Sequence, residues 1–218
     1  SKNIAYRAAM KFFEATGLNF GADISLTKRI PFAAGLAGGS TDAAAVLKAL
    51  NTLCETGLTD DELCAIGVKL GADVPFCIKG GTMLAQDIGQ VLSPLPKFKD
   101  CYIVLVKPDV SVSTKEAFEA FDTCDNIRHP ECSAMLHSAA NADFDGIIAN
   151  VGNVFEQFIE VPQRAEIKAI MREHGSLACC MSGSGPTVFG IFDSKEKAEN
   201  CVADIPQKLG KAFLTKPI

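Results

Sequence analysis

A glycine-rich stretch, Pro31-Phe-Ala-Ala-Gly-Leu-Ala-Gly-Gly-Ser-Thr41, runs directly into an alanine-rich segment that begins after Asp42. Glycine adopts positive φ without steric cost, so the glycines let the backbone turn tightly and approach an anion closely. The alanine-rich segment predicts a helix over 41–54, and the first N–H groups of a helix attract an anion at its N-terminus. The stretch therefore predicts a phosphate-binding turn, with a simple capped turn as the alternative.

Three common motifs do not fit this stretch. The P-loop needs a lysine before its Ser or Thr, whereas Gly35 is followed by Leu-Ala-Gly-Gly-Ser. The dinucleotide fingerprint Gly-x-Gly-x-x-Gly is incomplete here and in the later Gly183-Ser-Gly run. The hydrolase motif Gly-x-Ser-x-Gly fails at Asp42. A serine hydrolase remains a minor alternative, because Ser25-x-x-Lys28 has one spacing of that chemistry but lacks the partner motifs.

The stretch resembles the phosphate-binding motif of the GHMP kinases, small-molecule kinases that include galactokinase, homoserine kinase and mevalonate kinase. Two further segments follow in the family's order. Leu70-Gly-Ala-Asp-Val-Pro-Phe76 resembles the segment with the family's catalytic aspartate, and Met181-Ser-Gly-Ser-Gly-Pro-Thr-Val-Phe189 resembles its late glycine-rich motif. The resemblance spans nearly the whole chain.

The resemblance implies a set of site residues. Asp73 would be the catalytic base and would also contact the acceptor substrate. The acceptor would further contact Ser113, Thr114 and Phe118, with the Phe118 ring against a cytidyl group. The phosphates of ATP would lie against Pro31, Ala33, Ala34, Gly35, Leu36, Ala37, Gly38, Gly39, Ser40 and Thr41, and the late glycine motif comprises Ser182, Gly183, Ser184 and Gly185.

The residues alone leave alternatives open at two of these positions. An aspartate in the position of Asp73, between Gly-Ala and Val-Pro, is typical of a turn residue that solvates its own backbone. Phe118, near the start of a helix, is typical of a core aromatic. Only the resemblance favours catalysis and substrate stacking.

The implied activity is ATP-dependent phosphorylation of the 2-hydroxyl of a cytidyl-diphosphate-linked methylerythritol in the non-mevalonate isoprenoid route, with ATP and Mg²⁺ as cofactors. The Leu-Gly-Ala-Asp-Val-Pro string favours this acceptor over those of the homoserine and mevalonate kinases. A GHMP-like domain that binds a nucleotide without catalysis is a further alternative. No protein metal site is predicted, because His129, His137 and His174 lie far from paired cysteines.

One departure from the family pattern concerns the N-terminus. The members of the family that act on a cytidyl substrate begin with a segment that carries a short lysine-containing motif, nucleotide-pocket residues and an aromatic–histidine pair for the cytosine ring. The sequence starts at Ser1, inside what resembles the family's first lobe helix. We therefore expect a truncated chain that lacks the first strands of its N-terminal lobe, with low solubility or no catalysis.

The predicted fold class is α+β, with an incomplete N-terminal lobe over 1–107 and a ferredoxin-like lobe over 108–218. Periodicity and capping residues predict most elements. Helices are expected over 3–16, 41–54, 59–70, 144–158 and 162–174, and after Ser113 and Ser194. Strands are expected over 22–28, after Asp73, on both sides of 87–89, over 101–106, within 177–192 and over 211–216. The region 122–142 is expected to be rich in loops with one short helix.

Composition limits which classes of partner the chain can have, but it does not indicate the activity. The chain has 218 residues, 48% hydrophobic, and a net charge of −5 with dispersed basic residues, which argues against a nucleic-acid surface. No apolar run is long enough to span a membrane, and no signal peptide is visible. The nine cysteines lack Cys-x-x-Cys spacing, which predicts reduced, mostly buried thiols. We expect a cytoplasmic enzyme, a monomer or weak homodimer, whose partners are ATP and a small-molecule substrate.

Overall fold

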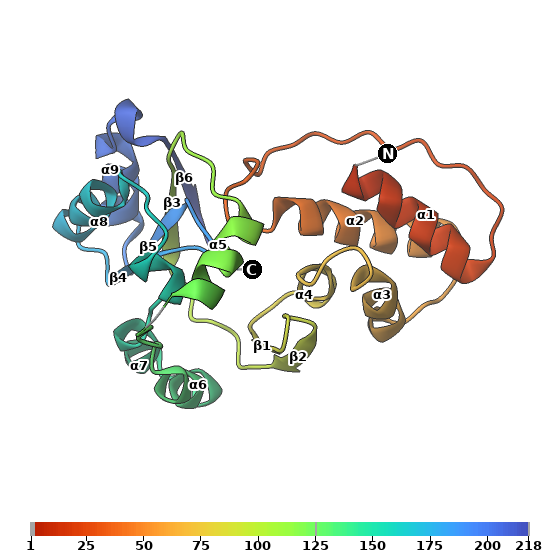
Figure 1. Cartoon of the computed structure of the whole chain (residues 1–218), viewed down its shortest axis with the longest axis horizontal. Coiled ribbons are helices and arrows are strands. Elements are labelled where there is room, and N and C mark those ends of the chain that lie inside the picture. The colour runs from red at the N-terminus through yellow and green to blue at the C-terminus, as the bar shows by residue number, and fades with distance from the viewer. Residues whose placement is uncertain (1–2, 125, 218) are drawn as a thin grey trace. The chain divides into compact units, whose positions relative to one another are not determined.

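The computed structural model describes residues 3–124 and 126–217 and divides the chain into two compact units (Figure 1). Unit 1 comprises Ser1–Phe32 and Ala37–Leu95, and unit 2 comprises Ala33–Leu36 and Pro96–Ile218. The short segment Ala33–Leu36 lies within the glycine-rich stretch, so this stretch contributes to both units. The lobe limits predicted from the sequence stay a prediction.

Unit 1 is a small helical assembly with one hairpin. Its elements are α1 (Ile4–Thr16), α2 (Gly38–Leu53), α3 (Asp60–Gly67), α4 (Val74–Lys79), β1 (Met83–Gln86) and β2 (Val91–Pro94). The predicted helix over 3–16 is confirmed: Ala5, Ala8 and Phe12 form its buried face, and it ends at Gly17 in the left-handed region. Helix α2 packs between α1 and α4, and the core of the unit lies where these helices meet.

The strand predicted over 22–28 is wrong. Residues 18–29 adopt neither helix nor strand, and no strand within 3–124 or 126–217 pairs with them. The side chains of Phe20, Ile24 and Leu26 are exposed. Alternation of apolar and polar residues describes a chain that could lie on a sheet, but a strand forms only when a neighbouring strand supplies its hydrogen bonds.

Unit 2 contains a four-stranded antiparallel sheet in the order β4-β5-β3-β6. The strands are β3 (Tyr102–Lys107), β4 (Ala178–Met181), β5 (Val188–Phe192) and β6 (Lys211–Thr215). Helices α8 (Arg164–Glu173) and α9 (Lys195–Asp204) pack on the sheet and lie together on one side of it in Figure 1. The order β3-helix-β4-β5-α9-β6, with β3 and β5 central, is ferredoxin-like, and the predicted α+β class with a ferredoxin-like lobe is confirmed.

The remaining elements of unit 2 lie between β3 and α8. They are α5 (Thr114–Thr123), α6 (Cys132–Ala140), α7 (Phe144–Ala149) and the 3₁₀ turn η1 (Val154–Gln157); a second 3₁₀ turn, η2 (Gln207–Leu209), precedes β6. The single helix predicted over 144–158 is wrong, because α7 ends at Ala149 and η1 begins only after Gly152 and Asn153. Asn153 caps η1 by accepting a hydrogen bond from the N–H of Phe155, so a side chain that favours turns separates the two elements.

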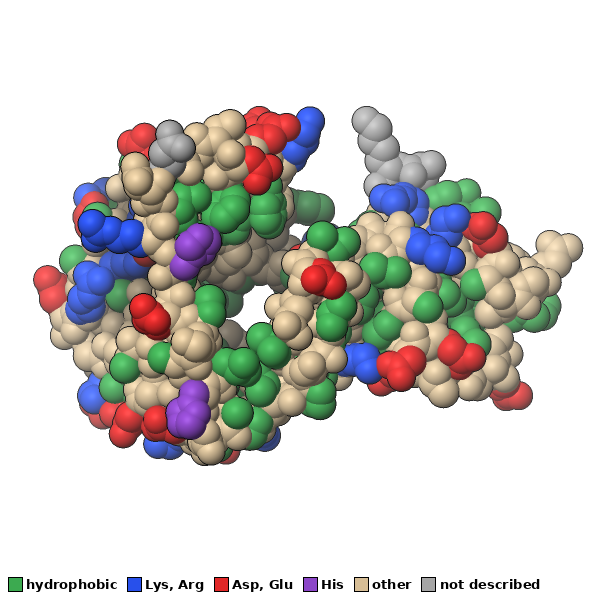
Figure 2. Space-filling view, turned by 60° about the horizontal axis from the view of Figure 1, so that its bottom comes forward, with side chains coloured by type: hydrophobic (Ala, Val, Ile, Leu, Met, Phe, Trp, Pro, Cys, Tyr) green, Lys and Arg blue, Asp and Glu red, His purple; other side chains and the backbone are tan. Residues whose placement is uncertain are grey.

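The surface carries charges of both signs. Figure 2 shows acidic and basic side chains scattered over the visible face of both units. Several large apolar side chains are also exposed, among them Phe32, Leu53 and Ile88. Among the residues that the structure describes, no helix combines the length and apolar character that a membrane crossing requires.

Candidate active site

The glycine-rich stretch forms an irregular loop that ends where α2 begins. Ala33, Gly35 and Ala37 have φ of 47°, 68° and 48°, and a non-glycine residue in this region costs of order 1–3 kcal/mol. Ala37 is the N-cap of α2, and none of the described side chains caps this helix end. The first N–H groups of this 16-residue helix are therefore available to an anion, as a phosphate-binding turn requires.

Lys28 fastens the first turn of α2 to the chain segment that precedes the loop. Its Nζ lies 2.5 Å from Oδ2 of Asp42 and donates a 3.0 Å hydrogen bond to the carbonyl oxygen of Gly38. Gly38 leaves room for this approach, because a Cβ there would lie 2.9 Å from Cγ2 of Ile30 and 3.5 Å from Nζ of Lys28. The pairing of Lys28 with Asp42 could not be predicted from the sequence.

The start of α2 adjoins the segment that carries Asp73, and both belong to unit 1. A Cβ built on Gly71 would lie 4.0 Å from Oγ of Ser40. The hydroxyl of Thr41 lies 3.6 Å from Sγ of Cys77 and also donates to the carbonyl oxygen of Ala37. Helix α4 packs on α2, so the fold brings the predicted catalytic segment beside the predicted phosphate loop.

Asp73 is the N-cap residue of α4, and the strand predicted after it is wrong. The apolar run that follows Asp73 forms a helix, because Pro75 lies in the first turn, where its missing N–H is tolerated. Val74 and Ile78, four residues apart, are both fully buried. The carboxylate of Asp73 does not cap the helix, so it is not committed to the turn role that the residues alone suggested.

The late glycine motif forms the turn between β4 and β5, and this turn contacts the part of the phosphate loop that belongs to unit 2, Ala33–Leu36. Oγ of Ser182 donates a 2.7 Å hydrogen bond to the carbonyl oxygen of Gly35. A Cβ on Gly35 would overlap the carbonyl oxygen of Ser182 and lie 2.8 Å from that of Gly185. Only glycine fits there, since the backbones touch and φ is positive.

The predicted acceptor residues lie at the start of α5, next to the same turn. Ser113 caps α5 by accepting a hydrogen bond from the N–H of Glu116. The hydroxyls of Thr114 and Ser184 are 3.1 Å apart, which links the acceptor segment to the late glycine motif. Phe118 is 54% exposed and stacks edge-on against Phe155, with 5.1 Å between the ring centroids. One face of unit 2 thus brings together an exposed ring, two hydroxyls and the glycine turn.

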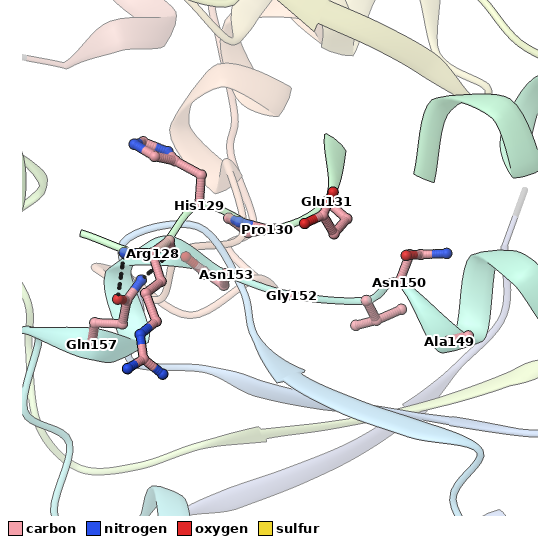
Figure 3. Close-up of a pocket in the computed structure, with 10 residues that line it drawn as sticks. Arg128, His129, Pro130, Glu131, Ala149, Asn150, Gly152, Asn153 and Gln157 are labelled. Carbon is pink, nitrogen blue, oxygen red and sulfur yellow. Dashed lines mark hydrogen bonds between the residues drawn. The ribbon is translucent and has the colours of Figure 1, made fainter. Parts of the chain in front are cut away.

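A pocket of about 280 Å³ opens in unit 2 beside the segment that joins α7 to η1 (Figure 3). Gln157 closes one side of it, accepting from the N–H of Arg128 at 3.0 Å and donating to the Arg128 carbonyl oxygen at 2.7 Å. A second hollow, of about 480 Å³, shares His129 and Asn153 with the first and reaches the late glycine turn at Ser182. No sequence motif predicted either pocket.

The polar side chains behind the late glycine turn could not be predicted from the sequence either. Asn153 donates to the carbonyl oxygens of Met181 and Gly183, and Glu156 accepts from the N–H of Met181. These partners are 25 to 30 residues apart in the chain.

Among the described residues, no group of three or more His, Cys, Asp or Glu side chains is arranged to hold a metal ion. Three of the nine cysteines, Cys101, Cys180 and Cys201, are buried, so the prediction of mostly buried thiols is wrong.

Two family models match the chain, "GHMP kinases N terminal domain" over residues 3–81 and "GHMP kinases C terminal" over residues 135–211. The 4-diphosphocytidyl-2-C-methyl-D-erythritol kinase of Clostridium beijerinckii is 45% identical over 219 residues, which cover 100% of this chain and 78% of that protein. The kinase of the same name from Geobacillus kaustophilus is 43% identical over 200 residues, which cover 91% of this chain and 69% of that protein.

Solved structures agree with these matches. A crystal structure of 4-(cytidine 5'-diphospho)-2C-methyl-D-erythritol kinase matches with a TM-score of 0.81 at 33% identity, over 98% of this chain and 77% of that chain. A homoserine kinase from Cytophaga hutchinsonii matches with a TM-score of 0.82 at 22% identity, over 100% of this chain and 76% of that chain. The second match concerns the fold alone.

Proposed function

The chain belongs to the GHMP kinases, and we propose that it transfers the γ-phosphate of ATP to the 2-hydroxyl of 4-diphosphocytidyl-2-C-methyl-D-erythritol. One observation carries the proposal: the segment with Asp73 lies beside Ser40, at a helix N-terminus that no described side chain caps. A free carboxylate next to an anion-binding turn is the arrangement that phosphoryl transfer to an alcohol needs. The relatives of that name, 40% to 45% identical over 91% to 100% of the chain, support the acceptor.

The phosphate loop would bind ATP mainly through its backbone. The N–H groups at the start of α2 and the positive end of its dipole would face the phosphates. Lys28 neutralises Asp42 in the same turn, so the carboxylate does not repel the nucleotide. The hydroxyls of Ser40 and Thr41 lie on this turn. That of Ser40 can donate to a phosphate oxygen, and that of Thr41 could do so by exchanging its bond to the carbonyl oxygen of Ala37. The contacts proposed for 31–39 rest on the family resemblance.

Mg²⁺ is the metal we propose for the bound nucleotide, and it would neutralise charge on the transferred phosphoryl group. The residues at the site fit this ion, because Mg²⁺ keeps several waters and takes only one or two protein ligands in addition to substrate phosphates. The hydroxyls of Ser40 and Thr41 would supply such oxygen ligands.

Asp73 would act on the acceptor. Its carboxylate would accept a hydrogen bond from the 2-hydroxyl, align the oxygen with the γ-phosphorus, and take the proton as the new P–O bond forms. The bond between the γ-phosphorus and the oxygen that bridges it to the β-phosphate breaks in the same reaction, and ADP leaves. Ser113, Thr114 and Phe118 would hold the cytidyl end of the acceptor, with the exposed Phe118 ring stacked on the base.

We place the enzyme in the cytoplasm, where ATP is available, as a monomer or weak homodimer. Buried free thiols at Cys101, Cys180 and Cys201 suit a reducing compartment.

The variant Asp73→Asn, made in the natural protein, tests the proposal. The amide keeps the shape of the side chain but cannot take the proton, so we expect kcat to fall by a factor of about 10² to 10⁴ while the affinity for ATP stays within about twofold. Asp60→Asn, at an exposed position of α3 in the same unit, is the matched control and should keep normal activity. An Asp73→Asn enzyme that retains most of its turnover would remove Asp73 from the role of base.

A further inference from the structure

Asn153 lies directly behind the late glycine turn, and its whole side-chain amide is used there. Nδ2 donates to the carbonyl oxygens of Met181 and Gly183, both at 2.7 Å. Oδ1 accepts from the N–H of Phe155 at 2.9 Å. The amide therefore binds the backbone on both sides of Ser182, and its hydrogen bond to η1 fixes its orientation.

Glu156 binds the same backbone as an acceptor, whereas Asn153 donates to it. Its Oε1 accepts from the N–H of Met181 at 2.6 Å, and its Oε2 lies 2.6 Å from Nζ of Lys168 on α8. The side chains of Lys168 and Glu156 are only 13% and 21% exposed. A charge-assisted bond in a partly dry environment is stronger and better aligned than one at the surface. Both backbone polar groups of Met181 are thus bonded to side chains from the η1 region.

The late glycine turn, held in place by Asn153 and Glu156, in turn contacts the phosphate loop. Ser182 follows Met181, and its hydroxyl donates to the carbonyl oxygen of Gly35. Gly35 lies between two alanines with positive φ, Ala33 and Ala37. Strained conformations of this kind persist only when the surroundings hold them, and Ala33–Leu36 packs with unit 2. The hydrogen bond from Ser182 is the direct side-chain link from the turn to this segment.

We infer that Asn153 and Glu156 are positioning residues for the nucleotide, which act through Ser182 and Gly35 without touching ATP. This inference rests on the proposed kinase function for its kinetic consequences. The two side chains set where the turn lies, the turn sets where the Gly35 carbonyl lies, and the loop backbone can then present its N–H groups to the phosphates. Loss of either side chain lets the loop relax before ATP binds.

Asn153→Ala and Asn150→Ala form a matched pair of variants. Asn150 lies three residues earlier in the same segment (Figure 3), and its Nδ2 donates to the carbonyl oxygen of Gly146 within α7. With Asn153→Ala, which removes three hydrogen bonds, we expect the Kd and KM for ATP to rise about tenfold, because part of their net contribution must be restored when ATP binds. The KM for the acceptor should stay within about twofold. Asn150→Ala should leave all of these constants unchanged.

Hydrogen exchange of the backbone amides provides a readout that does not depend on activity. In Asn153→Ala the amides of 33–36 and 182–185 should exchange faster than in the wild type, whereas in Asn150→Ala they should not. If Asn153→Ala fails to fold, Ser182→Ala tests the same chain of contacts, because it removes only the link to Gly35 and should reproduce the faster exchange at 33–36 and the weaker ATP binding.

The possible results separate the inference from the proposed function. Unchanged exchange at 33–36 and unchanged ATP affinity in the variant that folds would overturn the inference, as would an equal rise of both KM values. If the wild-type protein binds ATP but does not phosphorylate the cytidyl acceptor, the proposed acceptor is wrong, while ATP affinity and exchange still decide the role of Asn153.

Discussion

Lys28 and Asp42 form an ion pair near the start of α2, with 2.5 Å between Nζ and Oδ2 and side chains that are only 19% and 16% exposed. Removal of one partner would leave the other charge partly buried and unpaired. We expect Lys28→Met to lower the free energy of unfolding by about 2 kcal/mol, measured by urea denaturation. The double variant with Asp42→Asn should lose less than the sum of the two single losses.

Lys11→Met is the control for this pair. Lys11 lies 2.6 Å from Glu14 on α1, in the same unit, but the two side chains are 41% and 68% exposed. Exposed pairs contribute about 0.2–1 kcal/mol, so this variant should lose much less stability. Equal losses in Lys28→Met and Lys11→Met would show that burial adds nothing to the first pair.

Gly35 and Gly17 have almost the same φ, 68° and 69°, but different surroundings. A Cβ on Gly17 meets nothing within 4 Å, whereas one on Gly35 would overlap the carbonyl oxygen of Ser182. Gly17→Ala should therefore lower stability by about 1 kcal/mol from the positive φ alone and leave ATP binding intact. Gly35→Ala should weaken ATP binding at least tenfold, measured by calorimetric titration, because the loop must move. Normal ATP affinity in Gly35→Ala would mean that the contact with Ser182 does not set the loop.

Thr59 begins α3 with a complete capping box. Its hydroxyl accepts from the N–H of Glu62, and the carboxylate of Glu62 accepts from the N–H of Thr59. Thr59→Ala should lower the free energy of unfolding by about 1 kcal/mol. Thr52, whose hydroxyl donates to the carbonyl oxygen of Lys48 within α2, is the control: Thr52→Ala should change stability by less than about 0.5 kcal/mol. Urea denaturation of both variants measures the difference.

Helix starts could be predicted from the sequence because a cap is a bond between near neighbours. Thr59, Ser113 and Ser194 each accept a hydrogen bond from the N–H three residues later, and each begins a helix where the sequence predicted one. The segment 22–28 marks the limit of such local signals: its alternation is correct for a strand, but pairing depends on residues elsewhere. The run after Asp73 was misassigned for the opposite reason, since a short apolar run fits a strand and a buried helix equally well.

In the candidate site, too, some parts could be predicted from the sequence and others could not. The phosphate loop, Asp73 and the late glycine turn could be located because each is a contiguous motif. The supports of the site could not, because they join distant residues: Lys28 reaches Asp42 across 14 residues, and Asn153 reaches Gly183 across 30. No periodicity or spacing rule identifies such partners, which become neighbours only when the sheet and helices of each unit have packed.

Phe118 projects from α5 with more than half of its side chain exposed, although it packs edge-on against Phe155. If the ring stacks on the cytosine of the acceptor, Phe118→Leu removes a contact of about 1–3 kcal/mol. The KM for the acceptor should then rise about tenfold, with the KM for ATP unchanged, whereas Phe118→Tyr keeps the ring and should behave like the wild type. A rise in the KM for ATP instead would assign the ring to the nucleotide.

We expect the thiols of Cys180 and Cys201 to make the free energy of unfolding fall at alkaline pH. Burial, with smaller contributions from Glu156 and Asp204 respectively, raises the pKa of each thiol from 9.0 to about 11. The unfolded chain therefore releases these protons near pH 9 while the folded chain keeps them until about pH 11, so unfolding becomes easier as pH rises between these values. Each thiol contributes a slope of up to about 1.4 kcal/mol per pH unit in this window.

The decline can be measured by urea denaturation under reducing conditions from about pH 8 to about pH 10.5. Cys201→Ala, on the buried face of α9, should make the decline shallower, and the double variant with Cys180→Ala shallower still. Val188→Ala, in the same core, removes buried apolar atoms but no titrating group, so it should lower stability by the same amount at every pH. A slope in Cys201→Ala as steep as in the wild type would show that this thiol ionises equally easily in the folded and unfolded chain.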